Sequence, residues 1–183
     1  MKNEFESKII TLKNNKKIII REAQINDAEE LLNCIKKYIS DSKYIPKFKQ
    51  EIKLTIEQER NWIQSFLNAT NSILLIAELD GEIIGNIDLT GSQRKMMEHT
   101  AVIGMGMLNE WQNLGLGTAL LNEIINWAKL NSILELIWLQ VYTENSLGLG
   151  LYRKMGFVES GIIKNFFKRD GIYSDNLTMF MNL

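Results

Sequence analysis

The sequence has little of several residue types that decide where a protein works. Its 183 residues include one cysteine, one proline and one histidine. The single cysteine, Cys34, excludes an intrachain disulfide, and we expect it to be a small buried residue on an N-terminal helix. No apolar run approaches the ~20 residues that cross a bilayer, and residues 1–17 are too highly charged for a signal peptide. We therefore expect a cytoplasmic protein with no membrane partner.

An excess of charge of one sign is also absent. The chain has 21 lysines and arginines against 22 aspartates and glutamates, so its formal net charge is −1. Proteins that bind nucleic acid carry a basic excess, and we therefore expect no nucleic-acid partner. Hydrophobic residues make up 45% and charged residues 23% of the chain, which is typical of globular proteins. The length predicts one domain over residues 1–183.

The apolar pattern predicts alternating strands and helices. In chain order we expect a strand and then a helix within 16–39, a loop over 40–54, a helix over 55–69, two strands within 72–92, a strand over 100–108, a helix over 118–130, a strand over 134–142, a short helix over 146–157 and two strands within 157–183.

Local signals support several of these elements. Asp80-Gly81 and the later Asp170-Gly171 are strong hairpin turns, because both residues of such a turn adopt positive φ. Asn26 or Asp27 is expected to cap the first helix. The spacing of Thr55 and Gln58 is that of a capping box for the second helix.

Residues 100–142 predict a βαβ unit, whose two strands should be parallel with a right-handed crossover. Together with the hairpins, this unit predicts an α/β fold in which helices cover a mixed sheet. The ligand of such a unit normally binds beyond the carboxyl end of the first strand.

The stretch "QNLGLGT" (residues 112–118) lies at that position. Gly115 and Gly117 permit positive φ and a close approach of the backbone, and the free N–H groups of a helix start attract anions. It matches neither the P-loop nor the dinucleotide fingerprint. From the residues alone, this is either a cradle for a phosphate or a helix start that contains glycine.

The preceding strand, "TAVIGMGML", contains two further glycines. Gly104 and Gly106 fall on one face together with Thr100 and Val102. Glycine inside a strand marks either a ligand that approaches closely or tight packing against a helix. The residues alone leave both readings open.

These stretches resemble the GCN5-related N-acetyltransferase (GNAT) family. Residues 112–117 are similar to its Q/R-x-x-G-x-G/A signature. "NSLGLGLYRKMGF" is similar to its second signature, N-x-x-A-x-x-L-Y-x-x-x-G-F, with Gly148 in place of the usual alanine. The resemblance covers residues 16–181. The stretch "EHTAVIGMGM" resembles a bacterial branch that acetylates amino acids, small amines or protein amino groups.

The resemblance implies the GNAT fold, in which the two parallel strands splay apart, and an N-acetyltransferase that uses acetyl-CoA and no metal. The pyrophosphate of acetyl-CoA would bind backbone N–H groups from Leu114 to Thr118. The pantetheine arm would enter the gap, and Gly104 and Gly106 would suit a narrow tunnel. The residues implied to bind acetyl-CoA are Met107, Leu108, Gln112, Asn113, Leu114, Gly115, Leu116, Gly117, Thr118, Asn145 and Tyr152.

The implied reaction is direct attack of a neutral amine on the thioester. Tyr152 resembles the family tyrosine that protonates the departing CoA thiolate, and Asn145 the asparagine that binds the pantetheine arm. An amine of pKa ~10 must first lose a proton, so a base is expected. Related sequences often carry glutamate where this chain has Val102. The remaining candidates for the base are Glu98, His99 and Glu144.

The acceptor amine is expected to contact the N-terminal helices, the loop between them and the last hairpin. These segments contain Tyr38, Tyr44, Lys47, Phe48, Phe166 and Phe167. The aromatic residues either line a pocket, pack in the core or form the contact of a homodimer. Two other functions remain open: a domain that binds acyl-CoA without transferring it, and an enzyme that transfers a different acyl group.

Overall fold

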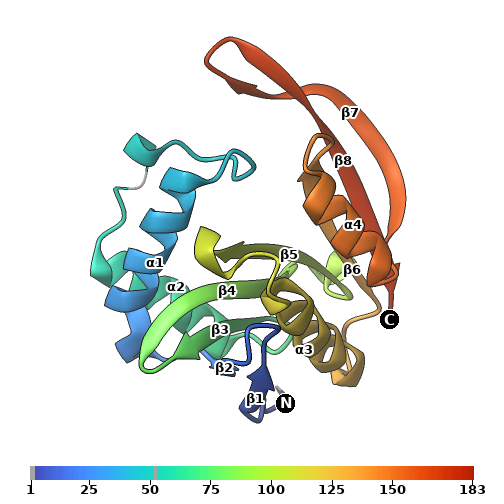
Figure 1. Cartoon of the computed structure of the whole chain (residues 1–183). Coiled ribbons are helices and arrows are strands. Elements are labelled where there is room, and N and C mark those ends of the chain that lie inside the picture. Colours follow the sequence, from blue (N-terminus) through green and yellow to red (C-terminus); the bar gives the residue numbers. More distant parts are fainter. Residues whose placement is uncertain (1–2, 52) are drawn as a thin grey trace.

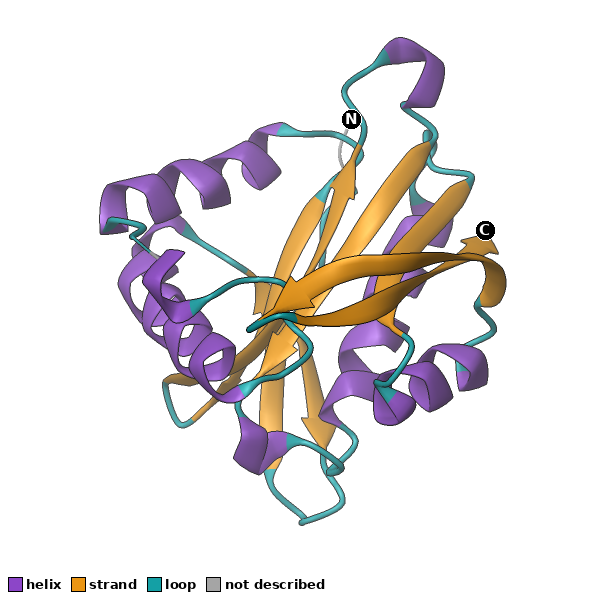
Figure 2. Ribbon diagram, turned by 90° about the horizontal axis from the view of Figure 1, so that it is seen from above, coloured by secondary structure: helices purple, strands orange, loops and turns teal. Residues whose placement is uncertain are grey.

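The computed structural model describes residues 3–51 and 53–183, and its centre is one mixed sheet (Figures 1 and 2). The strands lie in the order β1-β2-β3-β4-β5-β6-β8-β7. Their bounds are β1 Lys8–Thr11, β2 Lys17–Glu22, β3 Ile73–Leu79, β4 Glu82–Gly91, β5 Thr100–Met107, β6 Leu136–Tyr142, β7 Val158–Arg169 and β8 Ile172–Asn182.

Helices cover both faces of the sheet (Figure 2). The helices are α1 Ala28–Asp41, α2 Ile56–Asn68, α3 Leu116–Leu130 and α4 Ser146–Lys154. Strand β3 is buried on both faces: Leu74 and Ile76 join the apolar cluster of α1 and α2, whereas Leu75 joins that of α3. The predicted α/β fold is thus confirmed. None of the described helices has the length and apolarity to cross a membrane.

Most of the predicted elements are present at the predicted places. Both hairpin turns have positive φ at the two expected residues, with Asp80 at 50° and Gly81 at 89° in the first turn. The capping box of α2 is confirmed, because Gln58 N donates to Thr55 Oγ1 at 3.2 Å and Thr55 N donates to Gln58 Oε1 at 2.9 Å. Cys34 is buried on α1, as expected.

Strand β1 was not predicted. It has only four residues, and Ile9 at its centre is 72% exposed, so its sequence carries no alternating burial signal. It forms a sheet edge by antiparallel pairing with β2. The turn after β1 contacts the segment that precedes α3, because Lys13 N donates to Leu114 O at 3.0 Å.

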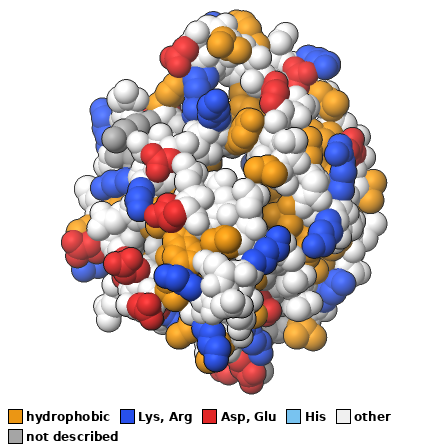
Figure 3. Space-filling model, viewed as in Figure 1, with side chains coloured by type: hydrophobic (Ala, Val, Ile, Leu, Met, Phe, Trp, Pro, Cys, Tyr) orange, Lys and Arg blue, Asp and Glu red, His pale blue; other side chains and the backbone are white. Residues whose placement is uncertain are grey.

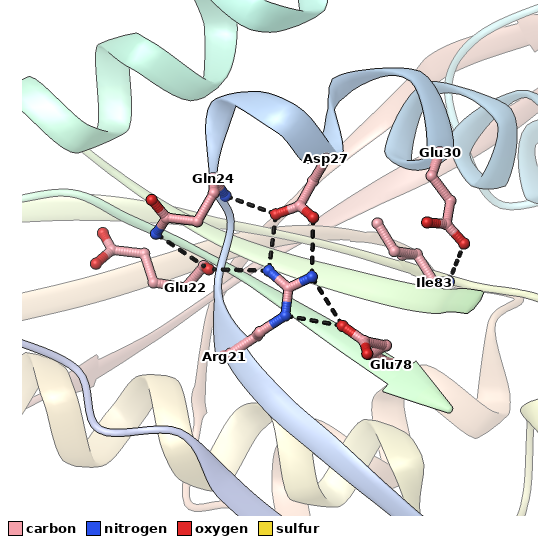
Figure 4. Close-up of polar contacts among 7 residues, drawn as sticks. All are labelled: Arg21, Glu22, Gln24, Asp27, Glu30, Glu78 and Ile83. Carbon is pink, nitrogen blue, oxygen red and sulfur yellow. Dashed lines mark hydrogen bonds and ion pairs between the residues drawn. The ribbon is translucent and has the colours of Figure 1, made fainter. Parts of the chain in front are cut away.

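The start of α1 is held by an ion-pair network rather than by the predicted cap (Figure 4). Asp27 occupies the cap position, but its side chain makes no cap hydrogen bond to α1. Its carboxylate instead accepts from Arg21 Nη1 at 2.7 Å and Nη2 at 2.8 Å, and from Gln24 N at 2.7 Å. Arg21 Nε also donates to Glu78 Oε2 at 2.8 Å. One guanidinium therefore joins β2, β3 and the start of α1.

The two strands of the predicted βαβ unit are parallel, as expected, but they pair over three positions only. Thr100 pairs with Leu136, and the pairing ends where Val102 faces Trp138. Beyond that point β5 stays paired with β4, and β6 with β8. The sheet is therefore open between β5 and β6 beyond Val102. We call this gap the opening.

We predict that Arg21→Met lowers the free energy of unfolding by about 2 kcal/mol, because two partly buried carboxylates lose their charged partner. Urea denaturation measures the change. Arg60→Met is the matched control: Arg60 pairs with Glu57 on the exposed surface of α2, and its loss should cost under about 0.5 kcal/mol. Equal effects of the two substitutions would contradict the role of the Arg21 network.

Candidate active site

A cleft of about 920 Å³ passes through the opening. On one side it reaches the start of α3 and helix α4, and on the other it reaches α1, α2 and the loop between them. Figure 3 shows this face of the molecule hollowed in its upper half, with positive and negative side chains interspersed around it. The cleft thus joins the predicted donor and acceptor regions.

The glycine loop (residues 112–117) leads into α3 at one end of this cleft. The helix begins at Leu116, two positions earlier than predicted, and Gly115 before it is left-handed with φ +97°. The first N–H groups of a helix lack intrahelical partners, and at the start of α3 these are the groups of Leu116, Gly117 and Thr118, which are the kind of donors that can bind an anion. A Cβ on Gly117 would lie 3.1 Å from Leu151 Cδ2 and 3.2 Å from Met107 Cε.

Lys13 is a charged residue at this loop that the sequence analysis missed. Its Nζ donates to Asn113 O at 3.4 Å, and the residue lines the cleft. No motif includes Lys13, since only the antiparallel pairing of β1 with β2 brings it here. It adds a positive charge to the helix start.

The other residues predicted to bind acetyl-CoA divide into two groups. Met107, Gln112 and Asn113 line the cleft. Leu108 is buried, its N donates to Ile84 O at 3.0 Å, and its carbonyl accepts from Trp111 N at 3.0 Å. Both peptide groups of Leu108 thus already take part in hydrogen bonds within the protein.

Asn145 and Tyr152 approach the cleft from α4. Asn145 caps the helix, because its Oδ1 accepts from Gly148 N at 3.0 Å. A Cβ on Gly148 would lie 2.7 Å from Asn145 Nδ2, which explains the glycine at this position of the signature. Burial raises the pKa of Tyr152 to about 12, so its hydroxyl stays protonated near neutral pH.

The three predicted base candidates lie outside the lining of the cleft. Glu98 and His99 precede β5, and the Glu98 carboxylate pairs with Lys95. The carbonyl of His99 accepts from Glu135 N at 2.8 Å. The side chain of Glu144 is exposed, and only its carbonyl, which accepts from Tyr44 OH at 3.2 Å, takes part in a bond across the molecule. None of the three is among the described residues that line the cleft.

The glycines of β5 are explained by close packing. A Cβ on Gly106 would overlap the ring of Tyr38, and one on Gly104 would lie 2.5 Å from Asp88 Oδ1. The wall above the two glycines is therefore filled by side chains of α1 and β4 rather than being bare backbone. Tyr38 OH donates to Asn86 Oδ1 at 3.0 Å.

Two acidic residues of the cleft escaped the sequence analysis. Asp88 of β4 accepts from Thr90 Oγ1 at 3.0 Å, and burial raises its pKa to about 6. Glu59 of α2 is 1% exposed and its Oε1 has no hydrogen-bond partner in the structure. Burial raises the pKa of Glu59 to about 7. We call the part of the cleft between α1, α2, β4 and β5 the acceptor pocket.

The residues expected to contact the acceptor lie in different environments. Tyr38, Tyr44 and Lys47 line the cleft. Phe167 stacks on Tyr142 with ring centroids 3.8 Å apart, and Phe166 packs edge-on against Phe167. The Phe48 ring lies under the guanidinium of Arg169 at 5.4 Å.

Arg169 fastens the loop after α1 to the last hairpin. Its guanidinium donates to Ser42 O at 3.3 Å, Ile45 O at 3.1 Å and Lys47 O at 3.4 Å. The hairpin therefore holds in place a loop that lines the acceptor pocket with Tyr44, Ile45 and Lys47.

The fold and the glycine loop define a class of protein. A mixed sheet that opens between two parallel strands, beside a glycine-containing helix start, is the acyl-CoA N-acyltransferase fold. The model of the acetyltransferase (GNAT) family matches residues 35–157 of this chain. The chain therefore belongs to the acetyltransferase (GNAT) family, as the resemblance predicted.

Individual relatives agree with this assignment. L-amino acid N-acetyltransferase AaaT from Escherichia coli (strain K12) is 31% identical over 105 residues, which are 55% of this chain and 62% of that protein. The chain spans less than two thirds of the length of the first curated relatives that it matches.

Solved structures match over more of the chain. The crystal structure of an acetyltransferase of the GNAT family from Streptococcus pneumoniae is 30% identical, with a TM-score of 0.88, and covers 91% of this chain and 99% of that chain. A GNAT superfamily phosphinothricin acetyltransferase (Pat) from Sinorhizobium meliloti, in complex with acetyl-CoA, shares the fold at 15% identity. Its TM-score is 0.81, and the match covers 95% of this chain and 89% of that chain.

We predict that Glu59→Gln makes stability less dependent on pH. The folded pKa of Glu59 is about 7 against 4.5 for the free group, so the folded state binds more protons in that interval, and wild-type stability falls as pH rises through it. The variant should exceed the wild type by about 2 kcal/mol at pH 8 and match it at pH 4.5. Urea denaturation from pH 4.5 to 8 measures this. Glu57→Gln, on the exposed face of α2, is the control, and the same pH trend in both variants would contradict the prediction.

Proposed function

We propose that this protein transfers the acetyl group of acetyl-CoA to a primary amine. The observation that carries the proposal is the continuity of the cleft, which joins the glycine loop to the acceptor pocket through the opening. Membership of the acetyltransferase (GNAT) family supports it. The curated relative named above is an L-amino acid N-acetyltransferase, which supports a free amino group as the acceptor.

The donor binds along the edge of β5 that faces the opening. The N–H groups of Leu116, Gly117 and Thr118 hold the pyrophosphate, with the helix dipole and Lys13 adding positive charge. The pantetheine arm lies in the opening, where β5 has lost its pairing with β6. Asn145 offers its Nδ2 group as a donor to the arm, since its Oδ1 already caps α4.

The reaction needs no covalent enzyme intermediate. The protein holds the thioester and the amine on the two sides of the opening. Their reaction then becomes effectively unimolecular, which lowers its entropic barrier. The neutral amine attacks the thioester carbonyl, a C–N bond forms, and the C–S bond breaks. Tyr152 donates its phenolic proton to the departing sulfur, and it is protonated near neutral pH as this role requires.

A direct test measures CoA release from acetyl-CoA with a panel of amines: L-methionine, phenethylamine, spermidine and a tetrapeptide with a free amino terminus. We expect release with at least one amine. Calorimetry measures acetyl-CoA binding in parallel. Binding of acetyl-CoA without release for any amine would overturn transfer in favour of a protein that only binds acyl-CoA.

We predict that Gly117→Leu raises the Kd for acetyl-CoA at least about tenfold, which is about 1.4 kcal/mol. The added side chain must displace Leu151 or Met107 at the helix start that holds the pyrophosphate. Calorimetry measures the Kd. Gly150→Leu is the matched control, because Gly150 lies on α4 with nothing within 4 Å of its Cβ position. Unchanged affinity of the Gly117 variant would remove the anion site from the proposal.

We predict that Tyr152→Phe lowers kcat about 100-fold while the Kd for acetyl-CoA stays near that of the wild type. The phenyl ring keeps the packing against Phe157, whose centroid is 6.0 Å away, and removes only the proton donor. Steady-state assays of CoA release give kcat, and calorimetry gives the Kd. An unchanged kcat would show that the thiolate leaves without help from this residue.

A further inference from the structure

We propose that Asp88 accepts the proton of the acceptor amine and that Glu59 is a second carboxylate that holds this amine as its ammonium ion. The inference rests on the proposed function, because it concerns the amine side of the same cleft. It deepens that function by assigning a proton acceptor and a charge preference to the acceptor pocket.

The position of Asp88 follows from the register of β4 and β5. Asp88 faces Gly104, and Thr90 faces Val102. Side chains at alternate positions share one face of a strand, so the Asp88 carboxylate lies on the α1–α2 side of the sheet. Gly104 leaves the space that this carboxylate fills. Gly104 is also two residues beyond Val102, the last residue of β5 that pairs with β6, so Asp88 lies beside the opening, where we place the thioester.

Glu59 supplies the independent observation that points to a ligand. It is 1% exposed, lines the cleft, and has an unpartnered Oε1. A buried carboxylate without a partner is costly, and a bound cation would remove that cost. Glu59 comes from α2 and Asp88 from β4, so the two carboxylates reach the acceptor pocket from different walls. Both raise the pKa of Tyr38, which places that ring near both of them.

The charged and titratable groups around Asp88 favour a cationic guest. Tyr38 from α1 stays protonated because burial raises its pKa strongly. Glu59 from α2 adds negative charge. Lys47 from the loop after α1 is the positive charge that lowers the pKa of both acids, and Thr90 donates to Asp88. Lys36 of α1 also lowers the pKa of Glu59, but it is not among the described residues that line the cleft. Asp88, Glu59 and Lys47 do line it, and this lining suits an ammonium ion.

The proton balance of the step is complete. The amine enters as an ammonium ion, and one of its protons moves to the Asp88 carboxylate. The neutral nitrogen attacks the thioester carbon, the C–N bond forms, and the C–S bond breaks. The thiolate gains a proton from Tyr152, and the second proton of the nitrogen, lost as the amide forms, returns to the Tyr152 oxygen through water in the cleft. The proton on Asp88 passes to water through the cleft, so one proton is released for each amide formed.

The test compares Asp88→Asn with the wild type on the best amine of the panel. We expect kcat/KM at pH 7 to fall about 100-fold while the Kd for acetyl-CoA stays unchanged. In the wild type, kcat/KM should rise with pH through an apparent pKa near 6. In Asp88→Asn the dependence on a group with a pKa near 6 should be absent, and the pH dependence that remains should follow the ionisation of Glu59, whose pKa is about 7, and the fraction of free amine in solution.

A second variant separates proton transfer from a merely structural role. Thr90→Val keeps the carboxylate but removes the hydrogen bond that lowers its pKa. The rise of kcat/KM with pH should therefore move to higher pH, while the maximal kcat/KM reached above it stays the same. A rise that does not move, or Asp88→Asn with wild-type kcat/KM, would overturn the assignment of Asp88.

Glu59→Gln tests the second carboxylate. Removing one negative charge should raise the KM of the amine about tenfold and change kcat less, because the ammonium ion loses part of its binding energy but keeps its proton acceptor. An unchanged KM would overturn the role of Glu59. Failure of the wild type to release CoA with every amine would instead overturn acetyl transfer itself, and the two failures are therefore distinguishable.

Discussion

The separation of β5 from β6 is the constraint on which the rest of the structure depends. Each strand is fully paired on its outer side, β5 with β4 and β6 with β8, so neither can shift to close the gap. Beyond Val102 the inner edges carry peptide groups that a closed sheet would have paired, and such groups need water or a ligand. The helix that connects the two strands starts at the same end of the sheet. One topological feature therefore creates both a bare strand edge and an anion site next to it.

The cleft that results is electrically polarised. At its donor end are the start of α3 and Lys13, where positive potential matches the phosphates of acetyl-CoA. At its acceptor end are Asp88 and Glu59, opposed by Lys47 in the lining and by Lys36 behind it. The net charge of the whole chain, −1, gives no indication of this separation of charge within the cleft. The two substrates of the proposed reaction carry opposite charge, and the cleft offers each the complementary end.

The features that the sequence predicts correctly are those determined by residues close together in the chain. The two hairpins, the capping box and the βαβ unit are set by neighbouring residues, and the structure contains all of them. The positions of Lys13 and Asp88 at the cleft depend on strand pairing, which no local sequence pattern predicts. Glu59 lies in "IEQER", where a charged run usually means a solvated helix face, and only the packing of α2 over the sheet buries it. Asp27 has the right position for a cap, yet Arg21 binds its carboxylate instead.

The acceptor pocket also sets a limit on the stability of this fold. Glu59 and Asp88 both have raised pKa values, so ionising either of them carries a cost that the unfolded chain does not bear. Apolar residues of similar size would pack there without that cost. A fold that retains two such carboxylates must be stabilised elsewhere, and two apolar clusters on opposite faces of the sheet and the Arg21 network do so. The unpartnered Oε1 of buried Glu59 is the clearest case of this cost, and the ammonium ion that we propose as its ligand would offset it.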